Sequence, residues 1–120
     1  MTVLFDHAAV YVDVRVLEYS GLDTANPLDA GGTAQAAGTG TSANSGAATV
    51  ATGNELLVGA GKTSGRFTAA GTGYSSRIIT SPDGDIAEDR IVSSGGSYSA
   101  TAAVTSSNWV MQIVAFQAQQ

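Results

Sequence analysis

The stretch Trp109-Val110-Met111-Gln112-Ile113-Val114-Ala115-Phe116 indicates the fold class of this chain. Successive side chains of a β-strand point to opposite faces. The stretch therefore has apolar side chains on both faces: Trp109, Met111, Ile113 and Ala115 on one, and Val110, Val114 and Phe116 on the other. A strand of this kind is covered on both sides or lies at a contact between subunits.

A second strong strand signal lies near the other end of the chain, from Val10 to Leu17. Valine occupies every second position of this segment, and Asp13 and Arg15 stand between the valines, which is the two-residue period of a β-strand. Because the two best strands lie at opposite ends, we expect the first and last strands to be central in an antiparallel β-sandwich.

Short apolar runs alternate with turn signals along the rest of the chain. Strands are predicted at 2–5, 46–52, 55–61, 66–70, 75–80, 86–92 and 97–104, and turns at 81–85, 94–96 and 106–108. The tract from Gly31 to Thr49 is rich in small residues, and we expect a mobile loop there. Roughly eight strands predict an all-β fold, a jelly-roll-like antiparallel β-sandwich, in a single domain over residues 1–120.

The composition narrows the classes of function. Charged residues make up 12% of the chain, and 5 Lys and Arg stand against 10 Asp and Glu, which gives a net charge of −5. Nucleic acids and anionic membranes need a basic surface, so we expect neither as a partner. A surface poor in charge and rich in Ser and Thr, with no cysteine, is typical of secreted bacterial β-domains, so we expect a secreted or cell-surface location.

Five stretches carry a resemblance to a known kind of domain: Arg15–Asp23, Asn54–Ala60, Glu88–Arg90, Ser97–Thr101 and Trp109–Phe116. In order and spacing they resemble an uncharacterised β-sandwich domain that recurs in large bacterial extracellular proteins. The resemblance implies a jelly-roll or lectin-like sandwich, often in tandem with adhesive modules. Members of that family carry further strands before the segment equivalent to Val3–Phe5, so the chain resembles the C-terminal part of such a domain, either a fragment or a natural short form.

The densest acidic cluster is a candidate calcium site. Asp83, Asp85 and Glu88 could supply carboxylate oxygens, and Gly84 would allow the chain to wrap tightly around a cation. The alternative, which we favour, is a Pro-Asp-Gly turn with solvated carboxylates. No cofactor other than calcium is expected.

Aromatic side chains suggest a sugar-binding surface. Tyr74, between Gly73 and Ser75, is the better exposed candidate, and Trp109 is the second, although a Trp at the start of a buried strand is more often part of the core. A polysaccharide is accordingly a candidate partner.

The sequence supports catalysis less well, and we assign no catalytic residue. Asp89 stands between Ala87 and Ile91 on one strand face, which favours a structural ion pair with Arg77 or Arg15. The function that we favour is a non-catalytic extracellular structural or binding module, carbohydrate-binding or adhesive. The alternative is a small hydrolase of glycosidase or esterase type that uses the acidic cluster or His7.

We also expect self-association. A sandwich without its first strands leaves an exposed edge and an apolar face, which a second copy could cover. The sequence therefore predicts a homo-oligomer, with Thr2–Phe5 or Val10–Leu17 near the contact. The alternative is that the tract from Gly31 to Thr49 folds back and covers the edge as an extra strand.

Overall fold

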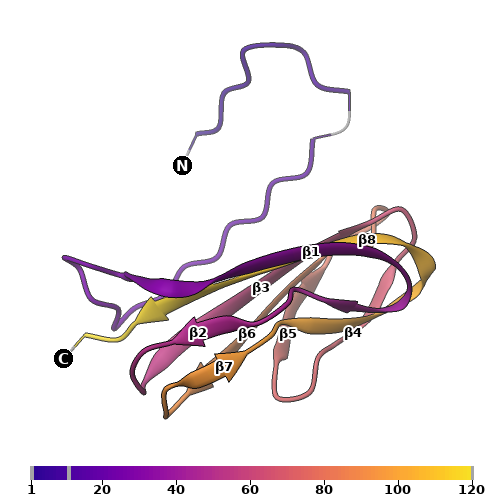
Figure 1. Cartoon of the computed structure of the whole chain (residues 1–120). Coiled ribbons are helices and arrows are strands. Elements are labelled where there is room, and N and C mark those ends of the chain that lie inside the picture. The colour runs from indigo at the N-terminus through magenta and orange to yellow at the C-terminus, as the bar shows by residue number, and fades with distance from the viewer. Residues whose placement is uncertain (1, 11, 120) are drawn as a thin grey trace.

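The computed structural model describes residues 2–10 and 12–119, and the described part of the chain is all-β, with eight strands and no helix (Figure 1). The strands are, in chain order, β1 (Leu28–Asn44), β2 (Ala48–Val50), β3 (Glu55–Thr63), β4 (Phe67–Ala70), β5 (Ser75–Ile79), β6 (Ile86–Val92), β7 (Gly96–Tyr98) and β8 (Thr101–Gln117). The predicted fold class, antiparallel sheets packed together as in a β-sandwich, is confirmed.

The main sheet is antiparallel and has the strand order β1-β8-β3-β6-β5, with β4 paired to the first part of β8. β1 and β8 are the longest strands, and they pair from Leu28↔Phe116 to Asn44↔Thr101. β8 lies between β1 and β3, so the prediction that the last strand is central is confirmed.

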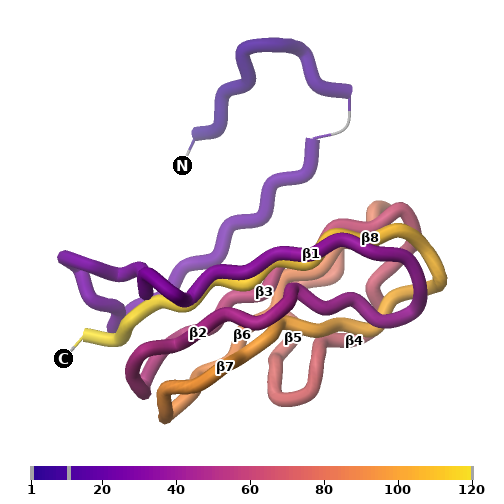
Figure 2. Tube along the Cα trace, viewed as in Figure 1, coloured from indigo at the N-terminus to yellow at the C-terminus, as the bar shows by residue number. Residues whose placement is uncertain are grey.

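The second layer forms because β1 and β8 bend together, as the trace in Figure 2 shows. Their pairing shifts register between Gly40 and Ser42, and Gly40 has a φ of +133°, which favours glycine. An irregularity of this kind bends a strand pair. One face of the main sheet is covered by a second layer. This layer consists of the end of β1 and the start of β8, which lie beyond the bend, together with β4 and the two-stranded sheet β2-β7. We call the covered face the inner face and the opposite one the outer face.

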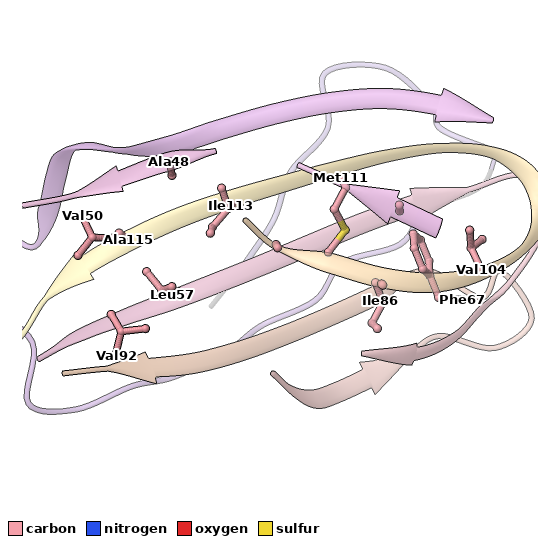
Figure 3. Close-up of a cluster of buried hydrophobic side chains, with 13 residues drawn as sticks. Ala48, Val50, Leu57, Phe67, Ile86, Val92, Val104, Met111, Ile113 and Ala115 are labelled. Atoms are coloured by element: carbon pink, nitrogen blue, oxygen red, sulfur yellow. The ribbon is translucent and has the colours of Figure 1, made fainter. Parts of the chain in front are cut away.

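The core lies between the two layers (Figure 3). Leu57, Met111 and Ile113 reach it from the main sheet, and Val50 and Phe67 reach it from the second layer. Gly61 keeps the layers close, because a Cβ there would lie 2.6 Å from Phe67 Cζ. Met111 and Ile113 thus face the core, as their shared strand face predicts, whereas Val110 on the opposite face is exposed and Val114 is half-buried.

The segment from Gly31 to Thr49 was expected to be a mobile loop, and this expectation is wrong. The segment forms most of β1 and the first part of β2. Its small residues carry no period, yet they fit a strand that packs closely on its neighbour: the indole of Trp109 lies over Gly38, where a Cβ would be 2.5 Å from Cζ2. The turn expected at 106–108 is also wrong, because these residues continue β8.

The expectation of a central strand from Val10 to Leu17 is wrong as well; residue 11 lies outside the described residues. Residues 12–22, which we call the strap, cross the outer face in an extended form, and within the described residues the only bridge of the strap is Leu22↔Ala118. The run 2–5 is not a strand either, and Figure 1 shows residues 2–10 projecting away from the sheets. The strap does not join the sheet as a strand because the side chains of Arg15 and Tyr19, rather than backbone hydrogen bonds, attach it to the outer face.

The packing of β8 leads to a stability prediction. Ile113→Ala should lower the free energy of unfolding by about 2–5 kcal/mol, because it removes apolar contacts and leaves a cavity in the core. Val110→Ala is the matched control, since Val110 is on the same strand, faces the other way and is 42% exposed. Chemical denaturation of both variants measures the difference, and equal losses would show that the register of β8 is wrong.

Candidate functional site

The outer face carries the strap on one side and an open hollow on the other. The hollow, of about 490 Å³, lies over β1, β8 and β3. Val58, Val114 and Phe116 give it an apolar floor, and Thr33, Gln35 and Gln112 give it polar groups. The two glutamines face each other across β1 and β8, and Gln112 Nε2 donates a hydrogen bond of 3.1 Å to Gln35 Oε1.

Asp89 fixes one end of the strap. Its carboxylate, 4% exposed, accepts hydrogen bonds from Arg77 Nε at 2.6 Å, from Arg77 Nη2 at 2.8 Å and from the Tyr19 hydroxyl at 2.7 Å. Burial by itself would raise the pKa of Asp89, but the bonds from Arg77 and Tyr19 outweigh burial and lower it. Burial and the bond to Asp89 raise the pKa of Tyr19 to about 12. The predicted ion pair of Asp89 with Arg77 is thus confirmed.

Arg15 fixes the other end of the strap. Its guanidinium donates to the Ile86 carbonyl at 3.1 Å and to the Gly61 carbonyl at 3.4 Å, and it lies 3.5 Å from Asp85. Asp85 is buried and also accepts a hydrogen bond of 2.9 Å from the Thr63 amide. Asp85 and Asp89 are buried on this face of the sheet, and a buried carboxylate is stable only with hydrogen-bond donors. The polar side of the strap, with Arg15 and Tyr19, therefore faces the sheet.

Glu88 lies on the inner face and is fully buried. Its Oε2 accepts a hydrogen bond of 2.9 Å from the Gly71 amide, while its Oε1 has no partner within the described residues. Burial raises the pKa of Glu88 to about 7, against the hydrogen bonds that lower it. The buried Tyr74 hydroxyl also lacks a partner among the described residues, and burial raises the pKa of Tyr74 to about 12.

Asp29, at the start of β1, and Glu55, at the start of β3, form a buried pair of acids. Asp29 accepts hydrogen bonds from the Ala51 amide at 2.8 Å and from the Gly31 amide at 3.0 Å, and the bond from Ala51 contributes most to lowering its pKa. Burial raises the pKa of Glu55, which accepts a bond of 3.0 Å from the Thr52 hydroxyl. This pair links the start of β1 to the loop before β3, and its hydrogen-bond donors all belong to the chain itself.

The structure does not bring the predicted calcium ligands together. Asp83 is exposed in the turn before β6, Asp85 binds Arg15 on the outer face, and Glu88 points into the interior. Among residues 2–10 and 12–119, no three His, Asp or Glu side chains gather as a metal site. In that same part of the chain there is no helix that is long and apolar enough to cross a membrane.

The aromatic candidates and His7 are not among the residues that line the hollow. Tyr74 and Trp109 are half-buried and pack against the core, and Trp109 also borders a shallow depression with Lys62 and Asn108. His7 is exposed and lies 3.0 Å from Asp6. A sugar-binding role of Tyr74 and Trp109 stays a prediction.

Sequence reasoning missed the hollow, because β1 was not recognised as a strand. The alternation of Val110, Val114 and Phe116 on one face of the last strand was the available signal. Comparisons with protein-family models, with curated proteins and with solved structures gave no match for this chain.

The burial of Glu88 predicts how stability depends on pH. Its pKa in the folded state, about 7, lies above the ordinary 4.5, so its neutral form is favoured by folding. The contribution of Glu88 is fully present below pH 4.5 and is lost as the pH rises through 7. Glu88→Gln should therefore flatten the decline in stability between about pH 5 and 7. Glu18→Gln, a change at an exposed position, is the control. Both variants keep Glu55, so its contribution to the pH dependence is the same in the two curves. Identical curves for the two variants would contradict the prediction.

The Asp89 cluster predicts that the strap can be released without unfolding the sheet. Tyr19→Phe removes the hydroxyl that holds the strap to Asp89 but leaves the Arg77 pair in place. We expect faster proteolysis at residues 12–20, with the amide hydrogen exchange of β3 and β8 unchanged. If residues 12–20 are as protected as in the unmodified chain, the Tyr19 hydroxyl does not hold the strap.

Proposed function

We propose that this chain is a non-catalytic structural or binding module, of the adhesive kind found in secreted or cell-surface proteins, and that it binds its partner through the outer-face hollow. The observation that carries the proposal is the hollow itself, a concave apolar area beside the strap. Ligand sites are concave and mostly apolar, with a few polar groups that fix orientation. The hollow combines Val58, Val114 and Phe116 with the paired amides of Gln35 and Gln112.

The positions of the acids support a non-catalytic role. Asp85 and Asp89 are occupied by Arg15 and Arg77, and Asp29 by backbone amides. Glu88 is enclosed in the interior, out of reach of a substrate. The small hydrolase that the sequence left as an alternative would have to release one of these acids from its partners, or use the exposed His7.

The partner of the hollow is either a protein surface or a polysaccharide, and the side-chain amides of Gln35 and Gln112 favour a polysaccharide. Gln35 and Gln112 are exposed, and with Thr33 they offer donors and acceptors suited to sugar hydroxyls. An extended neutral chain would lie on the apolar floor with these groups beside it. The resemblance to domains of bacterial extracellular proteins is compatible with a polysaccharide and with a protein partner.

Surface plasmon resonance with the immobilised chain tests the proposal. The analytes are soluble neutral polysaccharides, namely a β-glucan and a galactomannan, and the chain itself. We expect at least one analyte to bind, and Val114→Asp, on the floor of the hollow, to weaken binding at least tenfold, because a charge in an apolar contact is poorly solvated.

Ser97→Asp is the matched control. Ser97 is exposed on β7, in the layer that covers the inner face, so this variant should bind like the unmodified chain. Binding that survives in a folded Val114→Asp variant, or no binding of any analyte, would overturn the proposal.

A further inference from the structure

The strap has two different sides. Arg15 and Tyr19 bind the sheet, whereas the valines at alternate positions point away from it: Val12, Val14 and Val16 are 50%, 47% and 62% exposed. We call these three side chains the valine ridge. Three neighbouring valines in water on an otherwise anchored segment are an apolar surface without a cover, which marks an interaction site.

The valine ridge and the hollow lie on the same face of the molecule. The strap crosses β6 and the edge of β3, where it lies near Leu56 and Ile91, and the hollow opens over β3, β8 and β1. A ridge and a hollow of the same apolar character, side by side on one face, form a self-complementary surface. A two-fold axis between them places the ridge of each molecule against the hollow of the other, which is the geometry of an isologous dimer.

The charges on this face permit the approach of two acidic molecules. The chain has a net charge of −5, but it carries no charged residue between Asp29 and Glu55, so β1 is uncharged from its third residue onward. None of the residues that line the hollow is charged. Asp85 and Asp89, the acids beneath the strap, are paired with Arg15 and Arg77. On the strap, Asp13 lies 3.5 Å from Arg15, and Glu18 is exposed two residues beyond the valine ridge. Like-charge repulsion where the two faces would meet therefore comes mainly from Glu18.

The size of the face is sufficient. A specific interface takes roughly 800 Å² from each partner, and the molecule measures 42 × 33 × 20 Å. Ile91, 79% exposed on the same face, would be covered in the same contact.

We propose that the partner bound by the outer face is a second copy of this chain, and that the valine ridge of each copy lies in the hollow of the other. This inference rests on the proposed function, since it names the ligand of the hollow. It also gives the strap a role: Arg15 and Tyr19 hold the ridge at the height and position that the second copy requires.

Sedimentation velocity between about 5 and 200 µM tests the proposal, a range that spans the affinities of weak and moderate dimers. We expect a concentration-dependent species of twice 12.0 kDa. Val14→Asp and Val114→Lys should each weaken dimerisation at least tenfold, because each places a charge in an apolar contact. Val14 is exposed, so its replacement leaves the fold intact, and circular dichroism checks this for both variants. Ser97→Asp should dimerise like the unmodified chain.

Mixing the two variants tests directly whether the valine ridge of one copy contacts the hollow of the other. In a mixed dimer the aspartate introduced on the ridge of one copy meets the lysine introduced in the hollow of the other, and the remaining ridge and hollow are unmodified. The mixture should therefore dimerise more tightly than either variant alone. A species of 12.0 kDa that persists at the highest concentration, or unchanged dimerisation of both folded variants, would overturn the inference. If the monomer still binds a polysaccharide in a manner that depends on Val114, the proposed function stands and only the second copy is excluded.

Discussion

The pairing of β1 with β8 is the constraint on which the rest of the structure depends. The two strands stay hydrogen-bonded through a shared bend near Gly40, so the same pair of strands contributes to both layers of the sandwich. β3 and β4 then pair with β8 on either side of the bend. Met111 and Ile113 of β8 meet Phe67 of β4 and Val50 of β2 because the bend brings these strands over one another. A chain with few large apolar residues gains a closed core in this way.

The cost of burying a carboxyl group is offset in three different ways in this small domain. Asp89 keeps its charge by pairing with Arg77, and Asp29 keeps its charge by accepting bonds from backbone amides. Glu88 is fully buried, and burial outweighs the backbone hydrogen bonds that it accepts, so its neutral form is favoured. Each solution follows from what surrounds the carboxyl group, since an unpaired buried charge is costly. The acids thereby hold the architecture together and leave the outer-face hollow as the surface that is free to bind.

The strap shows how a sequence pattern can be correct in period and wrong in direction. Its valines alternate as in a strand, and the segment was expected to be a central strand of the sandwich. In the structure the polar side chains face the sheet, because Asp85 and Asp89 lie beneath them and attract Arg15 and Tyr19. The apolar side is left outward, and an interface with another molecule is the physical setting that would bury it.

The all-β class, the strands from β3 to β6 and the two faces of the last strand follow from the amino-acid sequence, because each depends on a local two-residue period and on nearby turn residues. It also limited the partner of Asp89 to Arg77 or Arg15, since an acid between apolar neighbours requires a cation, and the structure selects Arg77. That the tract of small residues forms β1 depends on long-range packing, because its fit requires Trp109 to lie over Gly38, a contact between distant parts of the chain. The same is true of the hollow and of the strap, whose positions are set by strands and buried charges that lie far away in the sequence.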